Sequence, residues 1–222
     1  MNAARRKPTE RKQLSAIVRQ YDRVAHLYST LEPLYLIFPP ARRRAVAALS
    51  LKPGDVVLEI GAGTGRNFPS LIEAVGPSGT VIGVDVSAGM LAEARKLIVR
   101  NAWSNAELLH QDAAQLQLKR DVDAVLFSLS YSVLPQPQLA LARAWERLRP
   151  SSRVVVMDLG LPDNLLGRAL GPIARLLDKL APGDPYSDPW SDLSTYGPVE
   201  TEHFLLGLYY ISFVTKRHDQ PS

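Results

Sequence analysis

Apolar positions follow a helical period in the first part of this chain. Between residues 10 and 31 apolar side chains recur every three to four positions, and basic residues occupy much of the opposite face. The apolar positions are Leu14, Ile17, Val18, Tyr21, Val24, Ala25, Tyr28 and Leu31. After Pro33, Pro39 and Pro40, a second helix is predicted at Ala41–Leu49. The chain is therefore expected to begin with two helices.

From residue 56 onward, short apolar runs alternate with helical patterns. Strands are predicted at Val56–Ile60, Val81–Val86, Glu107–Gln111, Ala124–Leu129 and Arg153–Leu159, with helices near Phe68–Val75, Gly89–Arg100 and Leu139–Leu148. This alternation indicates a parallel sheet covered by helices on both faces. Two further runs, Val199–Leu206 and Leu208–Lys216, flank Gly207 and are expected to close the sheet as an antiparallel hairpin.

The segment at about 161–196 is expected to be an insertion in this α/β pattern. It contains a mostly apolar helical stretch, Leu165–Leu180, followed by a loop rich in Pro, Asp and Ser. The helix can form part of a groove for an acyl chain or simply cover the edge of the sheet. We expect the insertion to shape the substrate site.

Composition excludes several kinds of chemistry. The chain has 222 residues and no cysteine, so disulfides, thiolate nucleophiles and zinc–sulfur sites are absent. Its four histidines are scattered without the spacing of a metal site, and we expect no metal. No run approaches the roughly 18 apolar residues that a membrane span needs, and the N-terminus lacks the apolar run of a signal peptide. A cytoplasmic location is therefore expected.

The net charge of +4 hides an asymmetry along the chain. Residues 1–50 hold ten Lys/Arg against three Asp/Glu, whereas the remainder is slightly acidic. A basic amphipathic helix of this kind can bind an anionic membrane surface or a nucleic acid, or it can be a solubilising tail.

The glycine-rich turn after the first predicted strand gives the strongest functional signal. It reads Glu59-Ile60-Gly61-Ala62-Gly63-Thr64-Gly65. A dinucleotide-binding loop needs its third glycine at position 66, which is Arg66, and a phosphate-binding loop needs Gly-Lys-Ser/Thr, which is missing. The spacing therefore favours a nucleoside ligand without a pyrophosphate.

The polar residues that follow the strands agree with such a ligand. Glu59 repels a pyrophosphate but favours a cationic group, and Asp85 can accept hydrogen bonds from a ribose diol. Met90 is placed to cover an adenine as an apolar wall, although such a residue is commonly part of a core. Asp112 can bind the adenine amino group or merely cap the next helix.

At these residues the chain resembles the class I S-adenosylmethionine-dependent methyltransferases. The resemblance covers about residues 50–160 and rests on E-x-G-x-G-x-G, the aspartate ending the second strand, Ser87–Arg95, and Gln111-Asp112. It implies a Rossmann-like, seven-stranded, mostly parallel sheet with a C-terminal antiparallel hairpin. It also implies S-adenosylmethionine as cofactor, S-adenosylhomocysteine as product, and residues 51–222 as the methyltransferase domain. The implied cofactor-binding residues are Glu59, Gly61, Gly63, Gly65, Asp85, Val86, Met90, Asp112, Ala113 and Ser128.

Within that family, residues 21–28 followed by Gly65-Arg66-Asn67-Phe68 resemble the quinone C-methyltransferases and the small bacterial phospholipid N-methyltransferases. The resemblance implies that residues 1–50 cap the cofactor site. Candidate catalytic residues are Tyr21, Tyr28 and His203, with His26 as a further possible base. Relatives carry Tyr-Asp where this chain has Tyr28-Ser29. The two tyrosines lie seven residues apart, on one helical face, and can also simply pack against the sheet.

The favoured acceptor is phosphatidylethanolamine, methylated at the inner face of the membrane by a peripherally bound monomer. The basic helix would then bind anionic lipid, at about 1 kcal/mol per charge near the surface. The alternatives are C-methylation of a quinone precursor or other small molecule, and a non-methylating S-adenosylmethionine-binding protein. A nucleic-acid substrate is disfavoured, because the fourth strand runs into Ser128-Leu129-Ser130-Tyr131 without the (N/D)-P-P-(Y/F) motif of base methylases.

Overall fold

The computed structural model describes residues 14–22, 25, 38–160, 188–204, 207 and 209–218. The helix predicted at Leu165–Leu180, and the catalytic candidates Tyr28 and His26, lie outside the described residues. Residues 14–22 are helical, as the apolar period predicts, and we call them the N-terminal helical segment.

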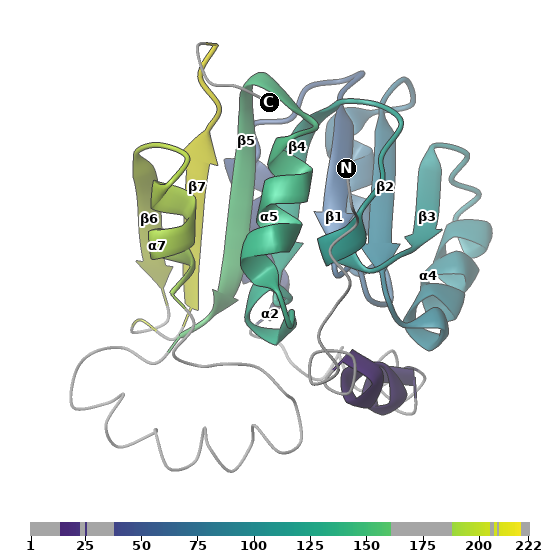
Figure 1. Ribbon diagram of the computed structural model, residues 1–222. Coiled ribbons are helices and arrows are strands. Elements are labelled where there is room, and N and C mark those ends of the chain that lie inside the picture. The colour runs from purple at the N-terminus through teal and green to yellow at the C-terminus, as the bar shows by residue number, and fades with distance from the viewer. Residues whose placement is uncertain are drawn as a thin grey trace.

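Seven strands form one mixed sheet in the order β3-β2-β1-β4-β5-β7-β6 (Figure 1). The strands are β1 (Val56–Ile60), β2 (Thr80–Asp85), β3 (Ala106–His110), β4 (Val122–Ser128), β5 (Leu148–Leu159), β6 (Val199–Phe204) and β7 (Tyr209–Thr215). The first five run parallel, whereas β7 is antiparallel to both β5 and β6. The predicted fold class, with its C-terminal antiparallel hairpin, is confirmed.

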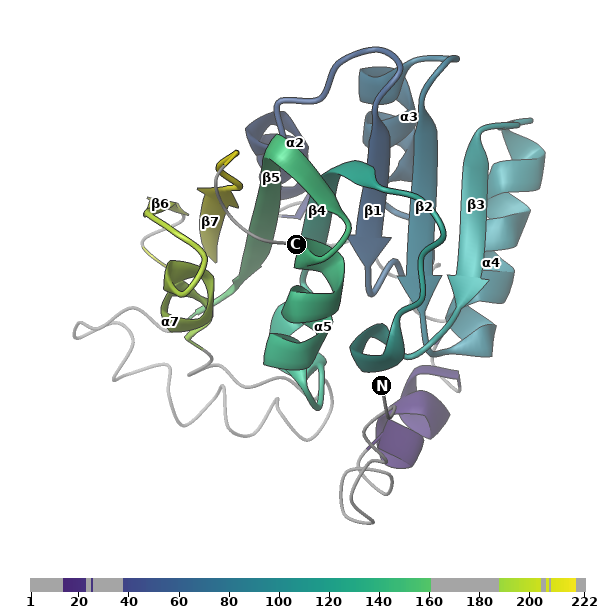
Figure 2. The ribbon, with the colours of Figure 1, turned by 45° about the horizontal axis from the view of Figure 1, so that its top comes forward.

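Helices cover both faces of the sheet. They are α2 (Phe38–Ala48), α3 (Phe68–Val75), α4 (Ala88–Arg100), α5 (Pro137–Trp145) and α7 (Pro189–Ser194). Helices α5 and α7 lie on the face turned to the viewer in Figure 1, and α2 and α3 lie behind the sheet, as the tilted view of Figure 2 also shows. Two hydrophobic cores result, because successive side chains of a strand point to opposite faces. Leu58 and Phe127 belong to the core under α5, whereas Val57 and Leu126 belong to the core under α3.

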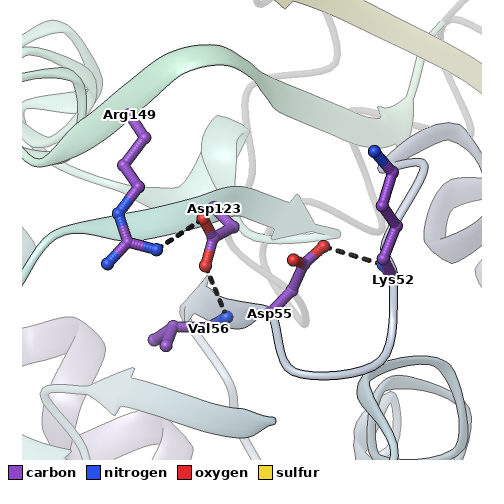
Figure 3. A network of polar contacts seen from close by, with 5 residues as sticks. All are labelled: Lys52, Asp55, Val56, Asp123 and Arg149. Atoms are coloured by element: carbon purple, nitrogen blue, oxygen red, sulfur yellow. Dashed lines mark hydrogen bonds and ion pairs between the residues drawn. The ribbon is translucent and has the colours of Figure 1, made fainter.

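An ionic network ties β1 to β4 at the amino ends of the strands (Figure 3). Asp123 accepts hydrogen bonds from the Val56 backbone N–H at 2.8 Å and from Arg149 Nη1 at 2.6 Å. Beside it, Asp55 accepts from the Lys52 backbone N–H at 2.7 Å and closes the turn before β1. Because β1 and β4 run parallel, the contact between Val56 and Asp123 at their amino ends helps to fix the register of the two strands. This register places Glu59 and Ser128 near the same, carboxyl ends of the strands.

Two elements differ most from the sequence prediction, and the other elements predicted within residues 38–160 and 188–218 match it to within three residues at each end. Strand β5 begins at Leu148 instead of Arg153, because Leu148 pairs with Val122 before the register shifts and Arg153 pairs with Ala124. Helix α7 begins at Pro189, where the predicted Pro/Asp/Ser-rich loop ends, and no element was predicted for its other residues. Pro189 occupies its first turn and Asp188 caps it by accepting from the Ser191 N–H at 3.1 Å. A proline and a capping aspartate can start a helix as well as break one.

Candidate functional site

A cavity opens where the parallel strands β1, β2 and β4 end. Its floor comes from those strand ends and the loops that follow them, and its other walls come from α2 and from the N-terminal helical segment. In Figures 1 and 2 the N-terminal helical segment, drawn in purple, lies beyond the arrowheads of β1 and β2. Ligands bind outside the carboxyl ends of strands in open α/β sheets, so the cavity lies where that rule places a site.

The glycine loop shapes the floor of the cavity. Gly61, at φ +71°, donates its N–H to the Val84 carbonyl at 2.8 Å, and a Cβ there would collide with the Ser130 side chain. Gly63, at φ +54°, differs, because a Cβ built on it would meet no atom within 4 Å. The first glycine therefore permits close packing inside the protein, and the second leaves room on the side of the cavity.

The carboxylate of Asp85, the last residue of β2, accepts hydrogen bonds from both the glycine loop and the start of α4. Its Oδ2 accepts from the Gly63 N–H and its Oδ1 from the Ser87 N–H, each at 2.8 Å. Burial raises the pKa of this carboxyl, and the two backbone N–H groups partly offset that effect. An ionised carboxylate has about four acceptor positions, so it can also receive the hydroxyls of a ribose.

A second polar group joins α2 to the ends of β1 and β4. Arg42 Nη1 donates to Ser128 Oγ at 3.2 Å and to Asn67 Oδ1 at 3.4 Å. The Asn67 amide nitrogen then donates to Glu59 Oε1 at 2.5 Å. Glu59 is 1% exposed, yet it lines the cavity together with Arg42 and Ser128. This wall therefore presents both an anion and a cation to a ligand.

The far wall is formed by the segments after β2 and β3. Met90 is buried against the cavity, and Val86 and Ala113 line it on the same side. Asp112 lines the cavity and also caps the short helix Ala113–Gln115, since its Oδ1 accepts from the Ala114 N–H at 3.1 Å. The two functions that the sequence leaves open for Asp112 are thus compatible.

The remaining wall is apolar. The N-terminal helical segment turns Leu14, Ile17, Val18 and Tyr21 toward the cavity. The loop after β4 contributes apolar side chains on its side, namely Leu129, Val133, Leu134 and Pro135. Two residues anchor this loop: Ser130 donates its hydroxyl to the Ile60 carbonyl at 2.7 Å, and Asp158 accepts from the Ser132 N–H at 3.0 Å.

Most of the predicted site residues that the structure describes line this one cavity. They are Tyr21, Glu59, Gly61, Gly63, Asp85, Val86, Met90, Asp112, Ala113 and Ser128. Gly65 does not line it: a Cβ there would lie 3.3 Å from the Ala94 Cβ, so this glycine serves the close approach of α4. His203 does not line it either. That side chain is exposed on the edge strand β6, and its ring stacks on that of Trp190 with 6.0 Å between the ring centroids, so the structure does not bring it together with the other predicted site residues.

Sequence reasoning did not identify Arg42, Arg66, Gln111 or the loop after β4 as parts of the wall. Arg42 belongs to a run of three arginines that resembles a solvated helix face. Its half-buried position beside Ala41 and Ala45, which are fully buried against the sheet, could have been inferred from the helical period.

Within the described part of the chain, no group of three or more His, Asp or Glu residues could hold a metal ion. Across the same residues, no helix combines the length and the apolar character that crossing a membrane requires.

The residues present fit S-adenosylmethionine. The space beside Gly63 can admit a ligand, Asp85 offers acceptors to a ribose, and Met90 and Asp112 offer an apolar surface and an acceptor to an adenine. The adjacent carboxylate of Glu59 and guanidinium of Arg42 match a ligand end that carries both charges. No glycine occupies position 66, where a pyrophosphate-binding loop would need one.

Comparisons with known proteins show that part of the chain is similar to methyltransferases. Residues 57–151 match the family model described as "Methyltransferase domain". Nocamycin O-methyltransferase from Saccharothrix syringae is 30% identical over 165 residues, which are 73% of this chain and 58% of that protein. Demethylmenaquinone methyltransferase from Lactobacillus johnsonii is 30% identical over 125 residues, 55% of this chain and 51% of that protein. The chain thus spans a little over half the length of these relatives.

Among solved structures, a methyltransferase from Thermotoga maritima, described as a possible histamine N-methyltransferase, superposes with a TM-score of 0.69 at 20% identity. The match covers 90% of this chain and all of that one. At that identity the likeness concerns the fold, and it agrees with the sheet order and the antiparallel hairpin described above.

Proposed function

We propose that this chain, which by its fold and its domain is a class I S-adenosylmethionine-dependent methyltransferase, transfers a methyl group to an apolar or amphipathic small molecule. The observation that carries the proposal is the division of the cavity into two parts. A polar floor built from Glu59, Asp85 and Asp112 suits the cofactor, and an apolar wall beside it suits the acceptor.

The apolar wall indicates which kind of acceptor the cavity can bind. It combines the N-terminal helical segment with the loop after β4, and its side chains include Ile17, Tyr21, Val133 and Leu134. An apolar acceptor bound there would exclude water and lie beside the strand end that carries Ser128. The relative named for demethylmenaquinone supports a quinol-type molecule as the first candidate.

S-adenosylmethionine, when bound, supplies a methyl group already activated on a sulfonium. Much of the catalysis that remains for the chain is to hold the acceptor in line at near-contact distance. Tyr21 is the predicted catalytic residue that the structure places in the cavity wall. Its hydroxyl could orient an acceptor hydroxyl or relay its proton, and its ring could hold a cationic acceptor by cation–π attraction.

A phospholipid acceptor is the second candidate, and the charge of the N-terminal part supports it. Ten Lys/Arg against three Asp/Glu in residues 1–50 suit an anionic membrane surface. Under this proposal the chain works from the cytoplasm at the inner face of the membrane. The apolar face of the N-terminal helical segment lines the cavity, so a lipid would enter beside this segment.

The test is methyl transfer from labelled S-adenosylmethionine to two acceptors in parallel. One is a demethylmenaquinone-type quinol in detergent, and the other is phosphatidylethanolamine in vesicles that contain anionic lipid. Label in the quinol supports the first candidate, and label in the phospholipid headgroup supports the second. Label in neither, from a protein that binds S-adenosylmethionine, would contradict both acceptors and leave another small molecule or a non-methylating binding protein.

Tyr21→Phe tests the acceptor wall in the same assay. Loss of the hydroxyl should lower kcat while leaving the affinity for S-adenosylhomocysteine within about twofold, because Tyr21 faces the acceptor side. The matched control is Tyr196→Phe, which changes a tyrosine that packs on Trp145 outside the cavity. Equal kcat values for Tyr21→Phe and wild type would remove Tyr21 from the chemistry.

A further inference from the structure

We propose that Arg42 binds the α-carboxylate of the methionine portion of S-adenosylmethionine, beside Glu59, which binds the α-ammonium. The inference rests on the proposed function, because it assigns a residue to the cofactor of that function. The juxtaposition that carries it is the chain of contacts from Arg42 through Asn67 to Glu59 on one wall of the cavity.

Arg42 is fixed in place by the helix that carries it. Its neighbours on α2, Ala41 and Ala45, are fully buried against the sheet, so the helix cannot turn without losing that packing. The Arg42 guanidinium then reaches Ser128 Oγ at 3.2 Å, at the carboxyl end of β4. A guanidinium carries five donors and stays protonated at any working pH. The wall therefore presents a fixed cation at the end of the strand.

Glu59 provides the opposite charge on the same wall. Its carboxylate is 1% exposed and accepts from the Asn67 amide at 2.5 Å. The Asn67 carbonyl oxygen in turn accepts from Arg42, so a single amide links the anion to the cation and sets their spacing. An α-amino acid carries an ammonium and a carboxylate on one carbon, and an anion–cation wall complements both.

Two other functions for Arg42 are chemically reasonable. The guanidinium could serve only to balance the buried charge of Glu59, in which case it would stabilise the fold without recognising the carboxylate. It could instead bind an anionic acceptor. Arg66 also lines the cavity and is the competing cation for the same role. Ligands that lack the α-carboxylate alone or the whole amino-acid portion separate these possibilities.

The experiment is isothermal titration of the full chain with three ligands. They are S-adenosylmethionine, decarboxylated S-adenosylmethionine and methylthioadenosine, which lacks the amino-acid portion and the positive charge on sulfur. We expect Arg42→Gln to weaken S-adenosylmethionine about tenfold or more, as the loss of a charge-assisted hydrogen bond implies. Its affinities for the other two ligands should stay within about twofold of wild type. Arg43→Gln, at an exposed position one residue further along α2, is the matched control and should bind all three as wild type does.

Arg42→Lys and Arg66→Gln complete the design. The lysine keeps a charge without the planar fork, so its preference for S-adenosylmethionine over the decarboxylated ligand should lie between those of wild type and Arg42→Gln. It also keeps the test available if the glutamine variant fails to fold. Arg66→Gln should keep the wild-type preference for S-adenosylmethionine over the decarboxylated ligand.

Three outcomes would overturn the assignment. Equal weakening of all three ligands by Arg42→Gln would mean a structural role, and unchanged affinity for S-adenosylmethionine would mean none. Loss of the preference in Arg66→Gln alone would assign the carboxylate to Arg66. If wild-type protein bound none of the three ligands, the proposed function itself would fail, and this result is distinct from the other three.

Discussion

Asp22 accepts a hydrogen bond from the hydroxyl of Ser87, with 2.6 Å between Ser87 Oγ and Asp22 Oδ1. The same oxygen accepts from the Gly89 N–H at 2.9 Å, so Asp22 lies at the amino end of α4. Ser87 in turn donates its backbone N–H to Asp85. The N-terminal helical segment is thereby tied to Asp85, the carboxylate that we propose binds the ribose.

Asp22→Ala should loosen the N-terminal helical segment. Two hydrogen bonds to an exposed carboxylate are lost, and about 0.5–1.5 kcal/mol is expected for such contacts. Amide hydrogen exchange of residues 14–22 should accelerate, and S-adenosylhomocysteine should slow it less than in wild type. Glu107→Ala removes an exposed carboxylate from β3 and serves as control. Identical exchange in Asp22→Ala and wild type would show that this contact does not hold the segment.

Gly63→Ala should separate ligand binding from folding. Both Gly63 and Gly54 have positive φ angles, +54° and +97°, so alanine at either position costs about 1–2 kcal/mol of backbone strain. Only Gly63 lines the cavity. We expect similar losses in the free energy of unfolding for Gly63→Ala and Gly54→Ala, and weakened S-adenosylhomocysteine binding for Gly63→Ala alone. Normal binding by Gly63→Ala would mean that the ligand does not lie against the loop there.

Asp158 should make the free energy of unfolding depend on pH. Burial raises the pKa of this carboxyl above its ordinary 3.8, so the folded protein holds the proton more tightly than the unfolded chain does. The contribution of Asp158 to the free energy of unfolding therefore falls as pH rises from 3.8 through the raised pKa. Asp158→Asn cannot titrate, and its stability relative to wild type should increase from about pH 4 to about pH 7 in urea unfolding. A constant difference across that range would contradict the raised pKa.

Tyr131 and Asp192 should be energetically coupled. The Tyr131 hydroxyl donates to Asp192 Oδ2 at 2.7 Å and joins the loop after β4 to helix α7. Burial raises the pKa of this phenol above its usual range, so it stays protonated and keeps donating. Tyr131→Phe should lower the free energy of unfolding by about 1–2 kcal/mol. In a double-mutant cycle with Asp192→Ala the coupling free energy should be about 1 kcal/mol. If the two substitutions have additive effects on the free energy of unfolding, the residues are not coupled.

The core of the fold could be predicted because its signals are local. The bounds of β1 and α3 follow directly from an apolar run and from a helical period after the glycine loop. Glu59 and Asp85 could be placed together for a similar reason, since Glu59 lies one residue before the end of β1 and Asp85 ends the neighbouring parallel strand β2. The start of β5 could not be predicted in the same way, because the extra residues depend on pairing with β4 across a register shift.

The site was predictable where its residues follow the ends of predicted strands, and not where a side chain reaches it from another part of the chain. Arg42 reaches Ser128 across 86 positions of sequence, and local periodicity contains no information on that contact. His203 was placed in the site by residue type alone. The sheet order puts β6 at the far end from β1, three strands beyond β4, and this separates His203 from the glycine loop.

Titration of S-adenosylmethionine into wild type and Asp85→Ala tests the central claim most directly, with thermal unfolding of both proteins as the measure of folding. The account predicts one bound ligand per chain in wild type. In a folded Asp85→Ala protein the affinity should be about tenfold weaker or worse, because the ribose acceptor is lost. Binding of equal strength in both proteins, or no binding by a folded wild type, would contradict the site described here.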